Sequence, residues 1–293
     1  MRKNFIAIGS FDGVHLGHRH LFAMLKDFAV LNQMRPMLLV FAVAPKVFAD
    51  KSHGVLTTAA EKKALLKKTG IEQIKFLDFA KIRNFTREEF FDILLRKYKM
   101  GGILCGKDFA FGKDRGGKSN FLKRACKQNG IVFECADFLE ADGEKISSSL
   151  IRKALKAGDI ESVNNMLGKE YEVSGKIVKG RQLGRKIGFP TANVDFDGLK
   201  ILPKGVYAVR VLLGKESFIG VCNIGCRPTV EKGGLPTCEV HILNFDRNIY
   251  GRYLTVRFVA KIRAEKHFST LGELTQQINK DSILAYKLLK NKR

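Results

Sequence analysis

The sequence predicts an α/β domain built on a parallel sheet, followed by an antiparallel β-barrel with a terminal helix. Over residues 1–165, apolar runs of strand length alternate with amphipathic helical segments. This alternation is typical of a parallel sheet with helices on both faces. From residue 166, strand-like runs follow one another with glycine-rich turns and no helix between them, which is typical of a barrel.

Short apolar runs and the segments between them predict the elements of the first domain. The strands are expected at 4–9, 37–43, 74–79, 101–106 and 131–138, and the helices at 18–31, 61–70, 87–99 and 119–129. Thr58 with Glu61, and Thr86 with Glu89, form capping-box patterns that start two of these helices. A phosphate-binding loop is expected at the carboxyl end of the first strand.

The second domain is expected to begin near residue 166, which divides the chain into 1–165 and 166–293. Its strands are expected at 172–178, 205–213, 218–225, 237–244 and 252–262. Helical periodicity returns over 270–289, where the apolar residues expected to face the barrel are Leu274, Ile278, Ala285 and Leu289.

The charge of the chain is strongly positive but evenly spread. Its 293 residues include 52 Lys and Arg against 29 Asp and Glu, a net charge of +23, with +11 in residues 1–165 and +12 in the remainder. Nucleic-acid binders concentrate such charge on one face or element, so we expect polyphosphate sites and no specific nucleic-acid partner. No apolar run reaches the ~20 residues of a membrane span. We expect a cytoplasmic protein without a membrane partner, and the oligomeric state is left open.

Residues 9–18, GSFDGVHLGH, connect the first expected strand to the first helix. A helix N-terminus presents free N–H groups to an anion, and Gly13 and Gly17 let the backbone approach a ligand closely. His15 and His18 can face the same phosphate, although two surface histidines beside a turn are the alternative. Such donors suit adenylyl transfer, because charge grows at the α-phosphate as pyrophosphate leaves.

A second candidate phosphate site lies at 146–152, ISSSLIR. Three hydroxyls precede an apolar helix, and Arg152 follows one turn later. An ordinary serine N-cap is the alternative interpretation. Combined with the histidine loop, the stretch predicts a phosphate clamp in which Arg152 reaches the β- and γ-phosphates.

These two stretches resemble the H-x-G-H and S-S-T-x-I-R motifs of the nucleotidyltransferase superfamily, which has a Rossmann-like sheet. The form G-x-F-D-G-V-H-x-G-H resembles the prokaryotic FAD synthetase module, and GKDFAFG at 106–112 resembles that family's loop near flavin and adenine. The resemblance implies attack of FMN phosphate on ATP, with Mg²⁺ bridging the phosphates. It implies ligand contacts at Gly9, Phe11, Asp12, Gly13, His15, His18, Asp108, Ser148, Ser149 and Arg152.

The first domain departs from that family's pattern at Ala44. The family usually has a histidine between two prolines there, whereas this chain has Val43-Ala44-Pro45. Loss of that histidine is expected to slow FAD synthesis at worst, because His15 and His18 remain.

A basic, glycine-rich stretch at 175–193 is the strongest single motif of the second domain. Three glycines, Gly180, Gly184 and Gly188, make this loop flexible. The loop can fold so that its backbone N–H groups bind a polyphosphate. Thr191 and Asn193 lie two apart on extended chain, so their side chains point to the same side. Their oxygens suit Mg²⁺ bound with ATP, although a basic hairpin loop is the alternative.

Glu239 is the candidate general base of the second domain. In its expected strand, alternation places Glu239 and His241 on one face, with Cys238 and Val240 on the other. A carboxylate there could take the proton of a substrate hydroxyl that attacks the γ-phosphate. A solvent-facing strand glutamate is the alternative.

Residues 169–290 resemble bacterial riboflavin kinase. The matching pieces are GRKIGFPTAN, LPKGVY, GVCNIG, Arg227-Pro228-Thr229, Glu239-x-His241, Tyr250-Gly251 and Arg263-x-Glu265-Lys266-x-Phe268. The resemblance implies phosphorylation of riboflavin by Mg-ATP, with Thr191 and Asn193 on Mg-ATP and Glu239 as base. It also places Asn223 and Arg263 in the flavin pocket.

Both motif sets together resemble the bifunctional bacterial riboflavin kinase/FAD synthetase. This implies an FMN adenylyltransferase domain at 1–165 and a riboflavin kinase domain at 166–293, converting riboflavin to FMN and FMN to FAD. One alternative is an active riboflavin kinase with a weak or regulatory N-terminal nucleotide-binding domain, motivated by Ala44. Another is a regulator that holds flavin or RNA, which would leave Thr191, Asn193 and Glu239 unexplained.

Overall fold

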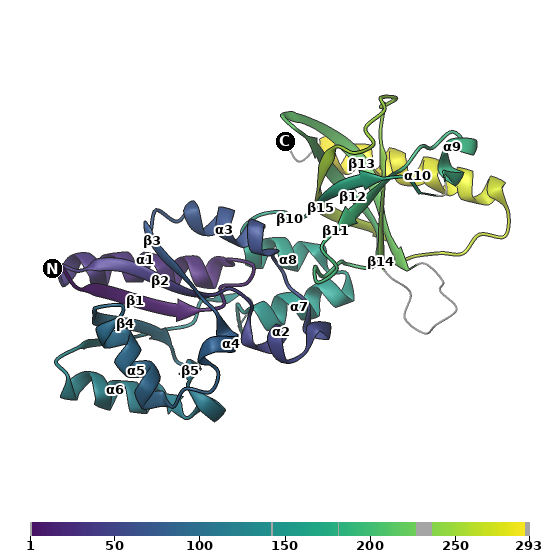
Figure 1. The fold of residues 1–293 in the computed structure, drawn as a ribbon. Coiled ribbons are helices and arrows are strands. Elements are labelled where there is room, and N and C mark those ends of the chain that lie inside the picture. Colours follow the sequence, from purple (N-terminus) through teal and green to yellow (C-terminus); the bar gives the residue numbers. More distant parts are fainter. Residues whose placement is uncertain (1, 142, 181, 227–235, 291–293) are drawn as a thin grey trace. The chain divides into compact units, whose positions relative to one another are not determined.

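The computed structural model describes residues 2–141, 143–180, 182–226 and 236–290 (Figure 1). Arg227, Pro228 and Thr229, which belong to the kinase resemblance, lie outside the described residues. The chain divides into two compact units, Met1–Ser148 and Ser149–Arg293.

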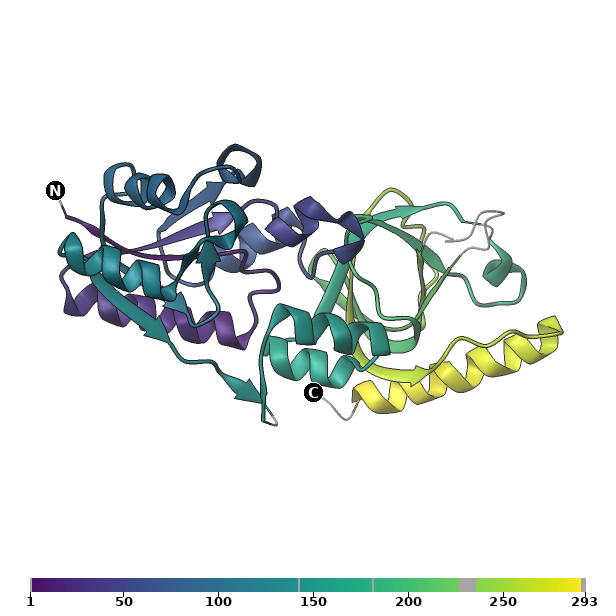
Figure 2. The same cartoon turned by 90° about the horizontal axis from the view of Figure 1, so that it is seen from below.

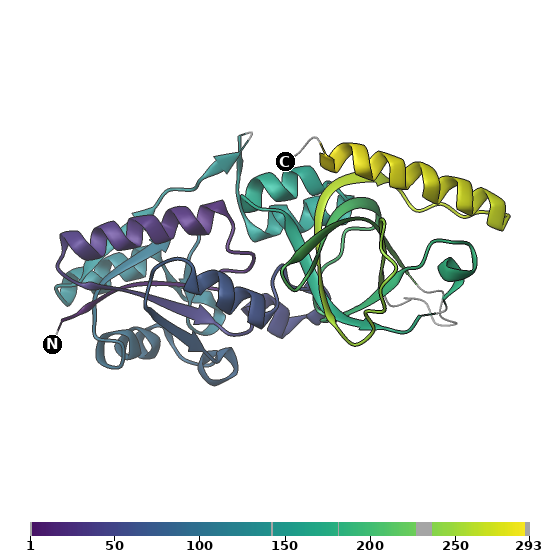
Figure 3. The same cartoon turned by 90° about the horizontal axis from the view of Figure 1, so that it is seen from above.

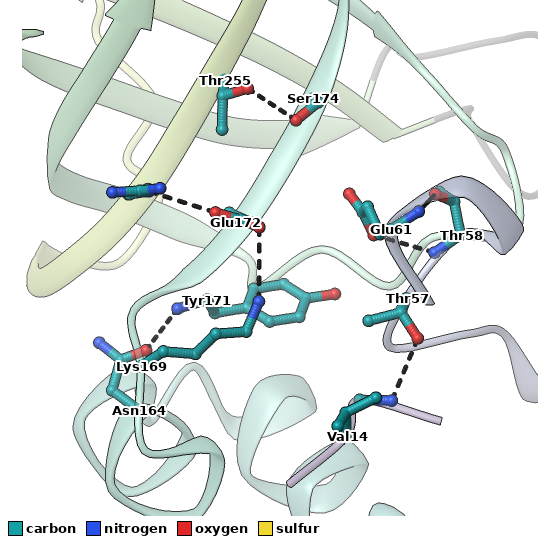
Figure 4. A network of polar contacts seen from close by, with 12 residues as sticks. Val14, Thr57, Thr58, Glu61, Asn164, Lys169, Tyr171, Glu172, Ser174 and Thr255 are labelled. Carbon is teal, nitrogen blue, oxygen red and sulfur yellow. Dashed lines mark hydrogen bonds and ion pairs between the residues drawn. The ribbon is translucent and has the colours of Figure 1, made fainter. Parts of the chain in front are cut away.

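This division falls before the boundary expected near residue 165, because helix α8 (Ile160–Leu167) packs on two barrel strands, β10 (Tyr171–Val178) and β15 (Tyr253–Arg263). Asn164 of α8 joins them, since its Nδ2 donates to the carbonyl of Phe258 at 2.9 Å. Its Oδ1 accepts from the backbone N–H of Tyr171 at 2.7 Å (Figure 4).

The first unit is built on a parallel sheet of five strands in the order β3-β2-β1-β4-β7. These strands are β1 (Asn4–Gly9), β2 (Arg35–Phe41), β3 (Gln73–Leu77), β4 (Met100–Gly106) and β7 (Val132–Ala136). The main helices are α1 (Leu16–Leu31), α3 (Ala59–Lys67), α5 (Arg87–Arg96) and α6 (Ser119–Gln128). The expected α/β architecture is therefore confirmed.

Shorter elements join these strands and helices. They are α2 (Pro45–Ala49), η1 (Lys51–His53), α4 (Phe79–Ile82), β5 (Ala110–Phe111), η2 (Lys113–Arg115), β6 (Gly117–Lys118), β8 (Glu140–Ala141) and β9 (Glu144–Lys145). The sequence patterns did not predict α2 or α4, because runs of four or five residues are too short for helical periodicity to show.

Both faces of the sheet carry a hydrophobic core. Phe5 and Ala7 of β1 pack in the core that includes α1 and α3, whereas Ile6 and Ile8 pack in the core that includes α5 and α6. Burial on both faces explains why the strands are continuous apolar runs rather than alternating ones. Both capping boxes are present at the starts of α3 and α5.

The second unit is a closed antiparallel barrel in the order β10-β11-β14-β13-β12-β15, seen along its opening in Figures 2 and 3. Its other strands are β11 (Ala192–Phe196), β12 (Gly205–Leu213), β13 (Glu216–Cys226) and β14 (Pro236–Ile242). The expected barrel is confirmed. One detail was wrong, since a single-turn helix, α9 (Leu183–Lys186), lies between β10 and β11. The unit also contains most of α7 (Ser148–Ala157).

The terminal helix α10 (Leu271–Lys290) packs against the outside of the barrel (Figure 3). As expected, Ala285 and Leu289 are buried, in a cluster with barrel residues that include Val206 and Val221. Among the helices of the described segments, none has both the length and the hydropathy required to cross a bilayer.

Candidate active sites

The loop between β1 and α1 is strained and tightly packed. Phe11 and Val14 have positive φ angles of 47° and 43°, a conformation that side chains rarely adopt and that persists where surrounding structure enforces it. A Cβ on Gly9 would lie 2.8 Å from the Phe11 ring, so glycine is required there by close approach. This packing gives the loop a defined path beside the start of α1.

His15 and His18 form one stacked pair at the N-terminus of α1. Their ring centroids are 3.6 Å apart, and His15 Nδ1 accepts the backbone N–H of His18 at 3.3 Å. A neutral His15 therefore carries its proton on Nε2, where it can donate to a ligand. Gly17 packs closely beside them, because a Cβ would lie 3.2 Å from His15 Nδ1 and 3.3 Å from the Ile146 carbonyl oxygen.

The pKa of His18 lies well below 6.5, first because the ring is buried, and then because His15 and Lys62 repel its charged form. His18 Nδ1 is buried without a hydrogen-bond partner among the described residues. A buried, unpaired nitrogen is costly unless something satisfies it. The arrangement favours a neutral imidazole that can accept or donate one hydrogen bond to a bound molecule.

Asp12 is structural support for this loop. The residue is 3% exposed. It accepts from the backbone N–H groups of Leu56 and Thr57 at 3.0 Å each, and from Thr57 Oγ1 at 2.9 Å. Thr57 Oγ1 in turn accepts the Gly13 N–H at 3.1 Å. The sequence motif identified Asp12, but Thr57 was missed because no local pattern links two residues so far apart in the chain.

The second phosphate motif meets the first through Ser148. Its hydroxyl donates to the carbonyl oxygen of Asp12 at 2.9 Å. Ser149 is exposed and Arg152 is buried on the first turns of α7. The structure therefore brings Ser148 to the histidine loop, and the phosphate contacts of Ser149 and Arg152 stay predictions.

Asp108 lies in the loop that follows β4. Because β1 and β4 are parallel neighbours, this loop leaves the same edge of the sheet as the histidine loop. The Asp108 carboxylate forms an ion pair with Lys145. The ammonium of Lys145 also lies 3.3 Å from the centroid of the Phe138 ring. No sequence motif identified Lys145. The available signal was its position as a basic residue directly before the ISSS run.

Strand pairing in the barrel places three predicted kinase residues in one row. Glu239 of β14 is paired with Asn193 of β11 on one side and with Asn223 of β13 on the other. Paired residues of antiparallel strands point to the same face of a sheet. The burial of Cys238 and Val240, with Glu239 and His241 only half-buried, confirms the expected alternation along β14.

The glycine-rich segment packs closely on this row. A Cβ on Gly180 would lie 2.4 Å from Asn193 Nδ2, and one on Gly184 would lie 2.3 Å from the Phe189 carbonyl oxygen. Gly188 has a φ of +84°, which glycine adopts without strain. His241 Nδ1 lies 2.9 Å from the Pro190 carbonyl oxygen, which ties the segment to β14.

A cavity of about 580 Å³ lies against the glycine-rich segment and the end of β14, within the range of small-molecule sites. Thr191 and His241 line it together with apolar groups that include Ile177, Phe189 and Tyr250. Asn193, Asn223 and Glu239 are not among its lining residues, although Glu239 directly precedes the lining residue Val240. Its lining mixes these apolar groups with polar and charged ones that include Gln182, Arg185 and Asn248.

Arg263 forms an ion pair with the terminal helix. Its guanidinium donates to the buried carboxylate of Asp281 at 2.9 to 3.2 Å, and Gln277 donates to the same carboxylate at 2.9 Å. The ion pair anchors α10 to the end of β15. The flavin contact expected of Arg263 stays a prediction.

Comparison with known proteins identifies a family for each part of the chain. The family model for FAD synthetase matches residues 1–150, and the model for riboflavin kinase matches residues 167–289. Bifunctional riboflavin kinase/FMN adenylyltransferases of Pseudomonas fluorescens and Escherichia coli K12 are each 36% identical, covering 96% of this chain and 91% of their own. The corresponding Bacillus subtilis protein is 33% identical over 99% of this chain and 94% of its own.

A solved structure has the same fold over both units. The crystal structure of a macrolide-efflux protein from Streptococcus pneumoniae superposes with a TM-score of 0.87 at 27% identity, covering 97% of this chain and 94% of its own. The two family models and these sequence relatives together cover nearly the whole chain. The chain therefore belongs to the family of bifunctional riboflavin kinase/FMN adenylyltransferases.

Proposed function

We propose that the barrel unit phosphorylates riboflavin to FMN with ATP, and that the N-terminal unit adenylylates FMN to FAD with release of pyrophosphate. The observation that supports this proposal is that residues from separate stretches of each motif set lie together within one unit. Ser148 meets the histidine loop in one unit. Asn193, Glu239 and Asn223 align in the other.

In adenylyl transfer, the FMN phosphate attacks the α-phosphate of ATP directly, so no protein nucleophile is needed. The free N–H groups at the start of α1 and the Nε2–H of His15 would donate to the ATP phosphates. His18 would contact the same phosphates as a neutral donor, while Ser149 and Arg152 would hold the β- and γ-phosphates. These groups position the reactants and stabilise the growing charge.

In the kinase reaction, Glu239 would accept the proton of the riboflavin hydroxyl that attacks the γ-phosphate. Thr191 and Asn193 fit a Mg²⁺ ion carried by ATP, because they supply the oxygen donors that Mg²⁺ prefers and leave its other positions to phosphate and water. Gly180 supports this assignment, since its missing side chain is what leaves room for the Asn193 amide.

The second candidate function is a riboflavin kinase whose N-terminal unit binds nucleotide but transfers adenylyl groups poorly. Ala44 favours it, because this residue, at the N-cap of α2, supplies no imidazole that could contact a nucleotide phosphate. Both candidates share the kinase reaction, so only the fate of FMN separates them.

A chromatographic product assay tests both. The protein is incubated with riboflavin, ATP and Mg²⁺, and separately with FMN, ATP and Mg²⁺. FMN followed by FAD in the first reaction, and FAD in the second, is expected. FMN alone in the first and no product in the second would favour the kinase with a binding domain. No product in either would contradict both.

A further inference from the structure

Lys62 is a buried cation that the proposed mechanism leaves without a role. It lies on α3, and its residue is 5% exposed. A buried charge is costly unless hydrogen bonds replace its water. Burial lowers the pKa of Lys62, and the nearby Asp12 carboxylate acts in the opposite direction.

The ammonium of Lys62 joins the carboxyl ends of two neighbouring strands. Its Nζ donates to the carbonyl oxygens of Ser10 at 3.3 Å, Phe41 at 3.0 Å and Ala42 at 3.3 Å. Ser10 follows β1 and begins the histidine loop, whereas Phe41 ends β2. An ammonium has three N–H donors, so each of them has a carbonyl acceptor.

The position of Lys62 is itself fixed by the start of α3. The capping box between Thr58 and Glu61 sets that start (Figure 4). The preceding residue, Thr57, is held by Asp12 and holds Gly13. The helix is therefore tied to the histidine loop on two sides, by Thr57 at Asp12 and Gly13, and by Lys62 at Ser10.

We propose that Lys62 is a positioning residue for adenylyl transfer. By tying Ser10 to the end of β2, it sets the path of the loop that carries His15 and His18 and holds that loop ready for the ATP phosphates. It acts through the backbone and through its fixed positive charge, because its buried ammonium is already enclosed by carbonyl groups. This inference rests on the proposed function of the N-terminal unit.

Three variants test it in the full chain. Lys62→Met keeps the length of the side chain and removes the donors and the charge. Lys62→Arg keeps a cation, but the fixed fork of a guanidinium cannot reproduce three donors from one nitrogen. Lys63→Met removes a charge from the neighbouring, exposed position of the same helix and is the matched control.

The readouts are kcat and KM for ATP in FAD synthesis from FMN, with FMN synthesis from riboflavin as an internal control. Lys62→Met is expected to lose about tenfold to hundredfold in kcat/KM for ATP, as displaced reactive groups do. Lys62→Arg is expected to lose less, and Lys63→Met is expected to match the wild type. FMN synthesis should be unchanged in all three.

The pH profile separates positioning from a purely structural role. The titratable or charged groups that act on His18 are His15, on the same turn of α1, and Lys62, on α3. Removing the Lys62 charge should raise the pKa of His18 and move the acidic limb of FAD synthesis to higher pH in Lys62→Met. Lys62→Arg should leave that limb in place.

Wild-type kcat/KM for ATP in a folded Lys62→Met protein would overturn the inference while leaving the proposed function intact. Thermal unfolding shows whether the first unit of Lys62→Met is folded. If it is not, Lys62→Arg becomes the deciding variant, and wild-type kinetics of FAD synthesis in Lys62→Arg would overturn the inference. A wild-type protein that makes FMN but no FAD would overturn the proposed adenylyl transfer and this inference together.

Discussion

Gly180→Ala is expected to disable the kinase reaction while sparing the rest of the protein. A Cβ at this position would lie 2.4 Å from Nδ2, 2.6 Å from Cγ and 2.7 Å from Oδ1 of Asn193. Ordinary contact begins at 3.4 Å, so the amide group must move by about 1 Å to restore normal packing. The backbone of Asn193 is paired on both sides, with Val178 and Glu239, so the side chain is the part that moves.

The size of the effect follows from that displacement. A reactive or metal-binding group misplaced by about 1 Å costs roughly a hundredfold in rate. We therefore expect kcat/KM for riboflavin phosphorylation to fall by about a hundredfold, whereas FAD synthesis from FMN should be unchanged. The free energy of unfolding should change little, because the clash is with the end of a side chain rather than with backbone.

The assay measures FMN formed from riboflavin and, separately, FAD formed from FMN in the same preparation. Gly198→Ala is the matched control, since a Cβ there meets no atom within 4 Å and its φ is not positive. It should behave as the wild type. Wild-type kinase activity in Gly180→Ala, or an equal loss in both variants, would refute the assignment of Asn193 to the Mg-ATP site.

Three further predictions concern other positions. His18→Ala should abolish FAD formation and spare FMN formation, and Glu239→Ala should do the reverse when FMN is supplied; equal loss of both activities in either variant would contradict two separate sites. Burial and neighbouring charge hold the pKa of His18 in the folded protein well below 6.5. As the pH falls below about 6.5, the unfolded chain binds a proton at this residue before the folded protein does, so the free energy of unfolding should decrease. Chemical denaturation should show a smaller acid loss in His18→Asn than in the wild type. Asp281→Ala should lower the free energy of unfolding by about 3 kcal/mol, because it leaves the mostly buried Arg263 guanidinium unpaired, and an unchanged urea midpoint would disprove this.

The sequence by itself determined the local structure and the identity of the motifs. Apolar runs and helical periodicity located the strands of the sheet, five strands of the barrel and most of the longer helices, because burial on one or two faces leaves a pattern within a single segment. Strand β11 and helix α8 were not located in this way. Capping boxes marked the starts of α3 and α5, since their hydrogen bonds span only three residues. The histidine loop, the serine run and the glycine-rich stretch were visible for the same reason, because each is contiguous.

Only the tertiary structure decided which distant residues meet. Strand order and register, which no local repeat encodes, put Asn193 and Asn223 on either side of Glu239. Packing of α3 on the sheet brought Lys62 to the carbonyl groups of Ser10, just after β1, and of Phe41, at the end of β2. The grouping of α8 with the barrel also depends on such contacts, because α8 packs on β10 and β15. Contacts between segments far apart in sequence depend on the path of the whole chain, and they are what converted a set of motifs into two sites.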